Sequence, residues 1–75
     1  MVPDLDALIT CNPEICHGKP VIKGTRIPVE LILGLIEDGA DNEEIIEMYP
    51  HITKVDIHAC VRYARKAIEN TSCVQ

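Results

Sequence analysis

The chain of 75 residues contains no Trp and no Phe, and its two aromatic residues are Tyr49 and Tyr63. A protein that stacks the bases of single-stranded nucleic acid needs several exposed aromatic rings, so this class of function is not expected. Hydrophobic residues nevertheless make up 47% of the chain. The sequence therefore predicts a core built from Ile, Leu, Val and Ala.

The sequence also lacks an apolar run of the roughly 20 residues that a membrane-spanning helix needs. Its first six residues carry no cation, whereas a signal peptide begins with a positively charged segment. We therefore expect a cytoplasmic protein that makes no membrane contact.

The length predicts one domain over residues 1–75. A domain of this size buries only about 60% of the surface that its unfolded chain exposes, so its stability is marginal without further support. A homodimer is the expected source of that support.

The most distinctive stretch is residues 16–28, in which two glycines, two prolines and three cations separate short β-branched runs. Gly24 and Thr25 stand between apolar segments and predict a tight turn. Pro28 has no N–H for a sheet but suits the start of a helix. We predict a β-hairpin or extended segment over residues 8–28 that leads into a helix.

Residues 29–69 carry the start and stop signals of three helices, and residues 70–75 form a polar tail. The first helix is predicted from near Pro28 to Asp38. Gly39 follows as the left-handed residue that ends many helices.

This first helix has more apolar surface than one neighbouring helix can cover. Leu31 and Leu35 form a stripe of their own beside the main one. We predict that both lie in a dimer interface. Strand exchange through the N-terminal segment is the alternative arrangement.

The second and third helices begin with capping boxes, in which a side chain at the first position and one three residues later bond each other's backbone N–H. Asp41 and Glu44 open the second helix, which stops before Pro50, and Thr53 and Asp56 open the third. At helical spacing the third helix repeats an apolar stripe, which we expect to be buried: Ile57, Val61, Ala64 and Ile68.

A short helix, a turn and a longer helix behind a first helix are the parts of a tri-helical helix-turn-helix unit. The predicted fold is therefore mainly α. In such a unit the last helix reads the major groove of DNA. The predicted DNA-binding residues are its polar ones, Lys54, His58, Arg62, Arg65 and Lys66.

The distribution of charge is compatible with two functions, DNA binding and protein binding. The net charge is −5, with seven acidic and no basic residues in 29–50 and four basic and two acidic residues in 51–75. DNA binding needs cations gathered on one face, whereas the acidic balance favours a protein-binding adaptor that does not contact DNA. A second group of cations, predicted to contact a phosphate or a partner, is Lys19, Lys23 and Arg26.

The four cysteines match no standard zinc-finger spacing. Cys11 and Cys16 could join Cys60 and a histidine in a zinc site only if the fold brought them together, and we expect reduced thiols and no metal. Cys73 lies in the polar tail.

An enzymatic function is not expected, and no cofactor is implied. Gly18-Lys19-Pro20 lacks the spacing of a phosphate-binding loop. Cys16 and His17, adjacent in a segment expected to be extended, would point apart and could not act as nucleophile and base.

The chain closely resembles the bacterial and archaeal family known as domain of unknown function 433, over residues 9–67. The resemblance implies a helix-turn-helix antitoxin that neutralises a PIN-like ribonuclease and, with it, represses its own operator DNA. It rests on Gly18–Val29 (GKPVIKGTRIPV), Asp38–Ala40 (DGA), Glu43–Ile46 (EEII) and Tyr49–Thr53 (YPHIT).

Overall fold

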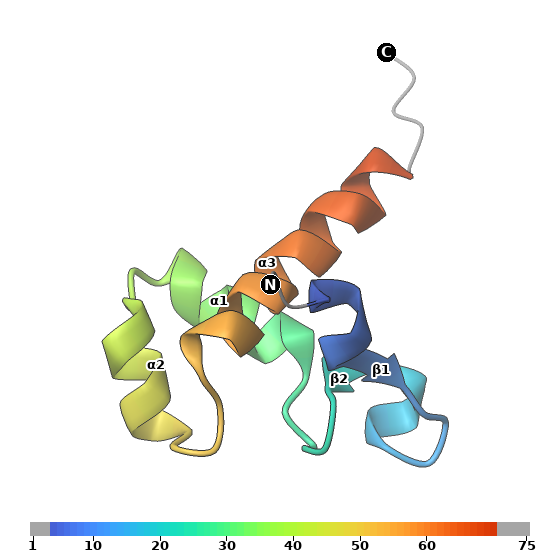
Figure 1. Cartoon of the computed structure of the whole chain (residues 1–75), viewed down its shortest axis with the longest axis horizontal. Coiled ribbons are helices and arrows are strands. Elements are labelled where there is room, and N and C mark those ends of the chain that lie inside the picture. The colour runs from blue at the N-terminus through green and yellow to red at the C-terminus, as the bar shows by residue number, and fades with distance from the viewer. Residues whose placement is uncertain (1–3, 71–75) are drawn as a thin grey trace.

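The structure is a computed structural model that describes residues 4–70. Three α-helices and a small antiparallel sheet make up this part of the chain, so the predicted mainly-α fold is confirmed (Figure 1). Within residues 4–70 no helix is long and apolar enough to cross a membrane. The elements in chain order are η1 (Leu5–Leu8), β1 (Ile9–Cys11), η2 (Cys16–Gly18), β2 (Pro20–Ile22), α1 (Val29–Glu37), α2 (Asn42–Met48) and α3 (Lys54–Glu69).

The predicted turn at Gly24 and Thr25 is present. The Thr25 N–H and hydroxyl donate to the Ile22 carbonyl at 3.0 and 2.7 Å, and the Ile22 N–H donates to the Ile27 carbonyl at 3.0 Å. Gly24 has φ +79°, a left-handed conformation that glycine adopts without steric cost. The turn leads directly into α1, as expected.

The sheet pairs different segments from those beside this turn. β2 pairs with β1, with Ile9 opposite Ile22, and only a single bridge links Val21 to Pro28 on the other side. Pro28 lacks an N–H and caps the start of α1, so a full strand cannot form there.

The helix boundaries follow the predicted caps. The Ala40 N–H donates to the Leu35 carbonyl, and the N–H of Gly39, with φ +98°, donates to the Ile36 carbonyl, each at 3.0 Å. These two bonds form the Schellman motif that ends α1. Both predicted capping boxes are formed, at the starts of α2 and α3.

The core lies where α1, α2 and α3 meet the end of β2, and it is aliphatic as predicted. Burial of these side chains is the main force that holds the helices together. The buried cluster contains Ile22, Val29, Ile32, Ile45, Ile52, Ile57 and Cys60.

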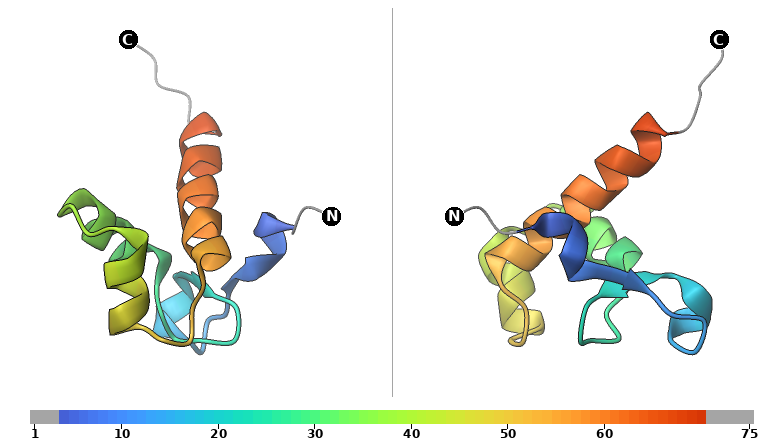
Figure 2. Two further views of the ribbon diagram at one scale, coloured as in Figure 1. Left: turned by 60° about the vertical axis from the view of Figure 1, so that its left-hand side comes forward. Right: turned by 45° about the vertical axis from the view of Figure 1, so that its right-hand side comes forward.

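The predicted burial of α3 is wrong in its C-terminal half. Ile57 is buried, but Val61 is 47% and Ile68 is 73% exposed. Ile68 lies in the last turns of α3, which project beyond the other elements (Figures 1 and 2), whereas Val61 lies at the middle of the helix, next to the buried Cys60. On α1, Leu35 packs against the core, whereas Leu31 remains 39% exposed.

Candidate functional site

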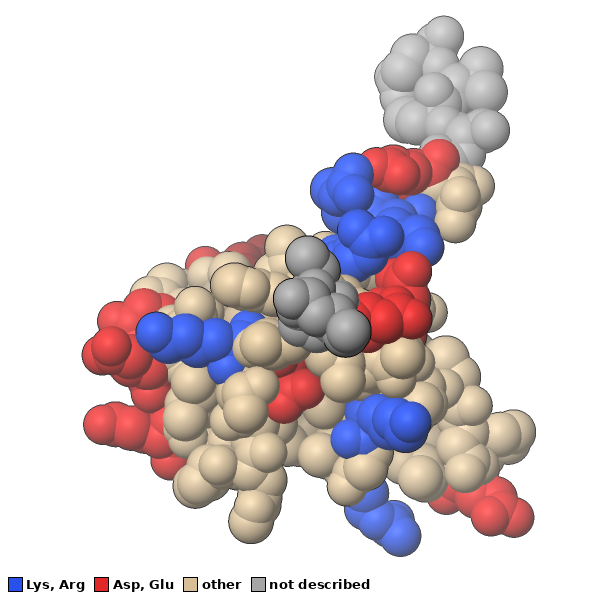
Figure 3. All heavy atoms as spheres, in the orientation of Figure 1, with Lys and Arg blue, Asp and Glu red and all other residues tan. Residues whose placement is uncertain are grey.

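The candidate site is the polar surface of α3. The side chains of Lys54, His58 and Arg65 are exposed and recur at helical spacing, so they follow one stripe along the helix. Arg65 forms an ion pair with Glu69 one turn later. The space-filling view shows cations gathered on the projecting part of α3 (Figure 3).

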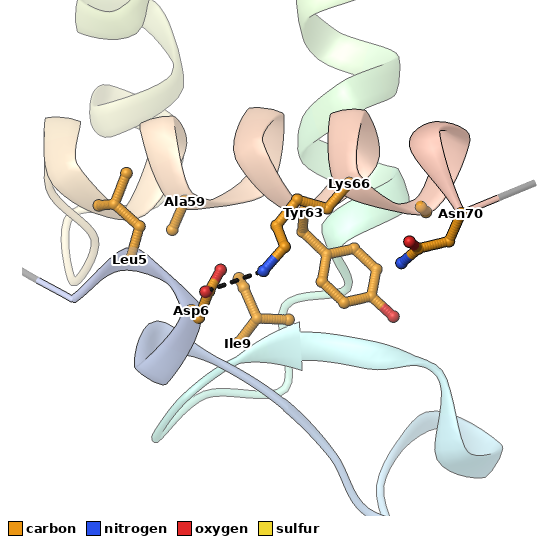
Figure 4. A pocket seen from close by; sticks show the side chains of 8 residues that line it. Leu5, Asp6, Ile9, Ala59, Tyr63, Lys66 and Asn70 are labelled. Carbon is orange, nitrogen blue, oxygen red and sulfur yellow. Dashed lines mark hydrogen bonds and ion pairs between the residues drawn. The ribbon is translucent and has the colours of Figure 1, made fainter.

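Arg62 and Lys66, one turn apart on α3, both contact a single carboxylate from the N-terminal segment. Arg62 Nε lies 3.1 Å from Asp6 Oδ1, and Lys66 Nζ lies 3.0 Å from Asp6 Oδ2. Figure 4 shows Lys66 reaching across to Asp6 on η1. The hydrogen bond from Lys66 and then that from Arg62 lower the pKa of Asp6 below its ordinary value of 3.8. We call this arrangement the Asp6 clamp.

Beside the Asp6 clamp is a hollow of about 320 Å³ between η1, β1 and α3. Leu5, Ile9 and Tyr63 form much of its wall (Figure 4). Tyr63 also lies close to Cys11. Burial is the largest cause that raises the pKa of Tyr63 above its ordinary value of 10.0. The hollow has a largely apolar wall and one ion pair at its rim. This lining indicates a packing contact between η1 and α3 and not a catalytic site.

The first turn of α3 lies next to acidic residues of α2. Lys54 shares a shallow hollow with Asp41, Asn42 and Glu43. Figure 3 shows anions predominating at this end of the molecule. The electrostatic attraction of Lys54 for a phosphate is therefore reduced at this end of the helix.

Lys19 differs from the other two cations of the second group of predicted contact residues, because it forms an ion pair within the chain. Lys19 Nζ lies 2.7 Å from Glu30 Oε1, and this hydrogen bond, together with the charge of Glu30, raises the pKa of Lys19. Lys23 and Arg26 are exposed on the turn between β2 and α1. These three cations therefore remain candidates for partner contact, with Lys19 already paired.

The described cysteines differ in burial, and all of them are free thiols. Cys60 is fully buried in the core, and this burial raises its pKa to about 11. The Cys16 thiol donates to the Arg26 carbonyl at 3.5 Å. Among residues 4–70 no three His, Cys, Asp or Glu side chains are placed to hold a metal ion. The prediction for Cys73 falls outside the described residues.

Cys16 and His17 are not extended, contrary to expectation. Both have positive φ, 51° and 57°, within η2. Non-glycine residues adopt this left-handed conformation at an energetic cost. The loop between β1 and β2 is therefore tightly coiled at this point.

Sequence periodicity identified the cations of α3, but it missed Asp6. Asp6 is 56 residues from Arg62 and 60 residues from Lys66 in the chain. No local spacing links residues so far apart, so only the packing of η1 against α3 reveals the Asp6 clamp.

The fold and this surface define a small helical domain with an N-terminal two-stranded sheet, whose longest helix carries a cationic face. Residues 9–64 match the family described as "Protein of unknown function (DUF433)". This match covers most of the chain, which therefore belongs to the DUF433 family.

Two relatives are similar to this chain. The uncharacterized protein y4eO of Sinorhizobium fredii (strain NBRC 101917 / NGR234) is 32% identical over 57 residues, which are 76% of this chain and 26% of the relative. A DUF433 member protein from Anabaena variabilis ATCC 29413, known from its crystal structure, has a TM-score of 0.77 and 32% identity, over 83% of this chain and 61% of the other. The chain thus spans about a quarter of the first and three fifths of the second.

Proposed function

We propose that this protein is a DNA-binding regulator of the helix-turn-helix type, which acts as a dimer in the cytoplasm and is not an enzyme. The observation that carries the proposal is the exposed polar stripe of Lys54, His58 and Arg65 on α3. This helix follows α2 after a connection of five residues, 49–53, as the recognition helix of such a unit does.

In this proposal the N-terminal half of α3 enters the major groove. Lys54 and His58 then face base edges, because the first turns of a recognition helix make these contacts. Arg65 lies further along and meets the phosphate backbone, whose contacts provide much of the affinity. Exposed ion pairs are weak, so a phosphate competes with Asp6 for Arg62 and Lys66.

The partner of such a regulator is proposed from its family resemblance to antitoxins. A PIN-like ribonuclease toxin needs a basic surface to hold its nucleic-acid substrate. The exposed acidic side chains of α2, Glu43, Glu44 and Glu47, complement such a surface. Binding there leaves Arg65, further along α3, free for DNA.

The test is a gel-shift assay with the DNA upstream of the protein's own gene, across a salt series and with scrambled DNA as control. We expect retardation of the upstream DNA that weakens steeply as salt rises. Arg65→Ala should lower the magnitude of the salt slope by about one, the value for one lost phosphate contact. Asp6→Asn should strengthen binding, because it leaves Arg62 and Lys66 without their carboxylate.

Lys23→Ala is the comparison variant, since it makes the same change in net charge in the second group of candidate cations, on the turn before α1. A larger loss in Lys23→Ala than in Arg65→Ala would assign the DNA contact to that turn and not to α3. Absence of any retardation at low salt would overturn the proposal.

The second candidate function is a protein-binding adaptor without DNA contact. The observation that favours it is the Asp6 clamp, which neutralises two of the five predicted DNA-binding residues. It predicts a stable complex with a basic protein encoded nearby and no shift of upstream DNA. Charge reversal on α2, such as Glu47→Lys, should weaken that complex.

A further inference from the structure

The apolar stripe of α3 is only half covered. Ile57, Val61, Ala64 and Ile68 are separated by four, three and four residues, the spacing of the contact seam between two paired helices. Ile57 is buried in the core, whereas Val61, at the middle of α3, and Ile68, on its projecting turns, are exposed. We call Val61, Ala64 and Ile68 the α3 seam.

The α3 seam borders a groove of about 390 Å³ between the projecting turns of α3 and the start of α1. Pro20, Val29 and Leu33 form one wall, and Ala64, Ala67 and Ile68 form the other. Ile68 is therefore both part of the groove and the most exposed of the large apolar side chains among residues 4–70. One patch thus offers a protruding side chain and a hollow that can receive one.

We propose that the α3 seam pairs antiparallel with the α3 seam of a second copy of this chain, with Ile68 of each copy seated in the groove of the other. A two-fold interface requires a patch that is complementary to itself. A protruding Ile68 beside an apolar groove meets this requirement, and seam spacing calls for another helix as the occupant.

The charges around the groove also favour a second copy. The charged residues that line the groove are Lys19 and Glu30, which form an ion pair with each other. The lining therefore carries one cation and one anion and has no net charge. A nucleic acid or a highly basic protein would be matched by charge of a single sign, whereas two copies with mixed rims can alternate their charges.

The same pairing is compatible with the proposed DNA contact, and this step rests on the proposed function. Around an ideal helix, at 100° per residue, the stripe of Lys54, His58 and Arg65 centres about 70° from the α3 seam, so the proposed DNA-contacting face and the seam lie side by side. Pairing that sets Ile68 beside Ala64 of the other copy is centred on residue 66 and places the two Lys54 residues about 36 Å apart, at 1.5 Å per residue. One turn of DNA separates half-sites by a similar distance, about 34 Å.

The test is the oligomeric state of the full chain without DNA, measured by sedimentation equilibrium from about 5 to about 500 µM, the range in which dimers of moderate affinity form. We expect a mass near twice the 8.3 kDa of the chain. Ile68→Glu and Val61→Glu should each raise the dissociation constant at least about tenfold, because a charge enters an apolar interface. Circular dichroism and thermal melting check that both variants stay folded, as their exposed positions predict.

Leu31→Glu is the matched control. Leu31 is an exposed leucine on α1 and does not line the groove, so this variant should remain a dimer. A dimer that survives Ile68→Glu and Val61→Glu but dissociates in Leu31→Glu would overturn the proposal and assign the interface to α1. A wild-type chain that stays monomeric throughout would overturn both this interface and the dimer of the proposed function, and would leave a different protein as the occupant of the groove. Because no DNA is present, neither result depends on operator binding.

Discussion

At the scale of single residues, Asp6 decides which charges α3 presents. Its carboxylate holds Arg62 and Lys66 at 3.1 and 3.0 Å and is itself half exposed. An anion that approaches α3 therefore meets two cations that are already paired, while Arg65 and Lys54 lie outside the Asp6 clamp. The N-terminal segment thus moderates the electrostatic potential of the helix.

The first prediction concerns the pH dependence of this clamp. The pKa of Asp6 is lowered in the folded protein, so its contribution to stability is present above its unfolded value of 3.8 and is lost as the pH falls through the folded pKa. Wild type should therefore melt at a higher temperature than Asp6→Asn near neutral pH, and the gap should close as the pH falls below 3.8 and through the lowered pKa of Asp6. Thermal unfolding followed by circular dichroism measures both.

Glu14→Gln serves as control, since it removes another exposed carboxylate of the N-terminal segment. A gap between wild type and Asp6→Asn that persists unchanged in acid would contradict the role of the Asp6 ion pairs.

At the scale of the element, α3 is a helix of two halves. Its N-terminal half is fixed by the Thr53 cap and by Ile57 and Cys60 in the core, while its C-terminal half projects from the body (Figure 2). A projecting helical end loses the packing that normally stabilises helices of this length. The start of α3 and the contacts of its exposed seam therefore matter more than they would in a fully packed helix.

The Thr53 cap stabilises the first turn of α3. The Asp56 N–H donates to the Thr53 hydroxyl at 3.4 Å, and Asp56 accepts from the Thr53 N–H at 2.9 Å. Thr53→Ala should lower the free energy of unfolding by about 1 kcal/mol. Thr53→Ser keeps the hydroxyl and should change it by only a few tenths. Urea unfolding compares the two, and equal losses would show that the hydroxyl does not cap the helix.

At the scale of the whole molecule, the domain is small and its core contains few side chains. Such a domain is only marginally stable. Pairing through the α3 seam would bury apolar side chains, such as Ile68, that are exposed in the single chain. Folding and association are then linked by mass action, because only the folded chain presents the seam and the groove.

This linkage predicts a melting temperature that rises with protein concentration. Across about a 100-fold range, wild type should melt at progressively higher temperature, and Ile68→Glu should melt at one temperature throughout. Differential scanning calorimetry measures this, with Leu31→Glu expected to behave as wild type. A wild-type melting temperature independent of concentration would contradict the linkage.

Much of the site could be predicted from spacing along the chain. The cations of α3 recur at helical intervals, and Lys54 and Arg65 are exposed as such spacing indicates. The Asp6 clamp could not be predicted, because its partners meet only when η1 packs against α3. The prediction that Val61 and Ile68 are buried was wrong for a related reason. Periodicity identifies the apolar face of a helix but not how much of that face the rest of the fold covers.

The sequence by itself determined the local features, namely the turn at Gly24, the end of α1 at Gly39 and the capped start of α3. Each depends on hydrogen bonds between residues two to five apart, so neighbouring residues are sufficient to specify them. Only the tertiary structure decided that β1 pairs with β2, that Asp6 meets α3 and that the last turns of α3 project with Ile68 exposed. These features join distant parts of the chain, and the competition among all buried surfaces selects them.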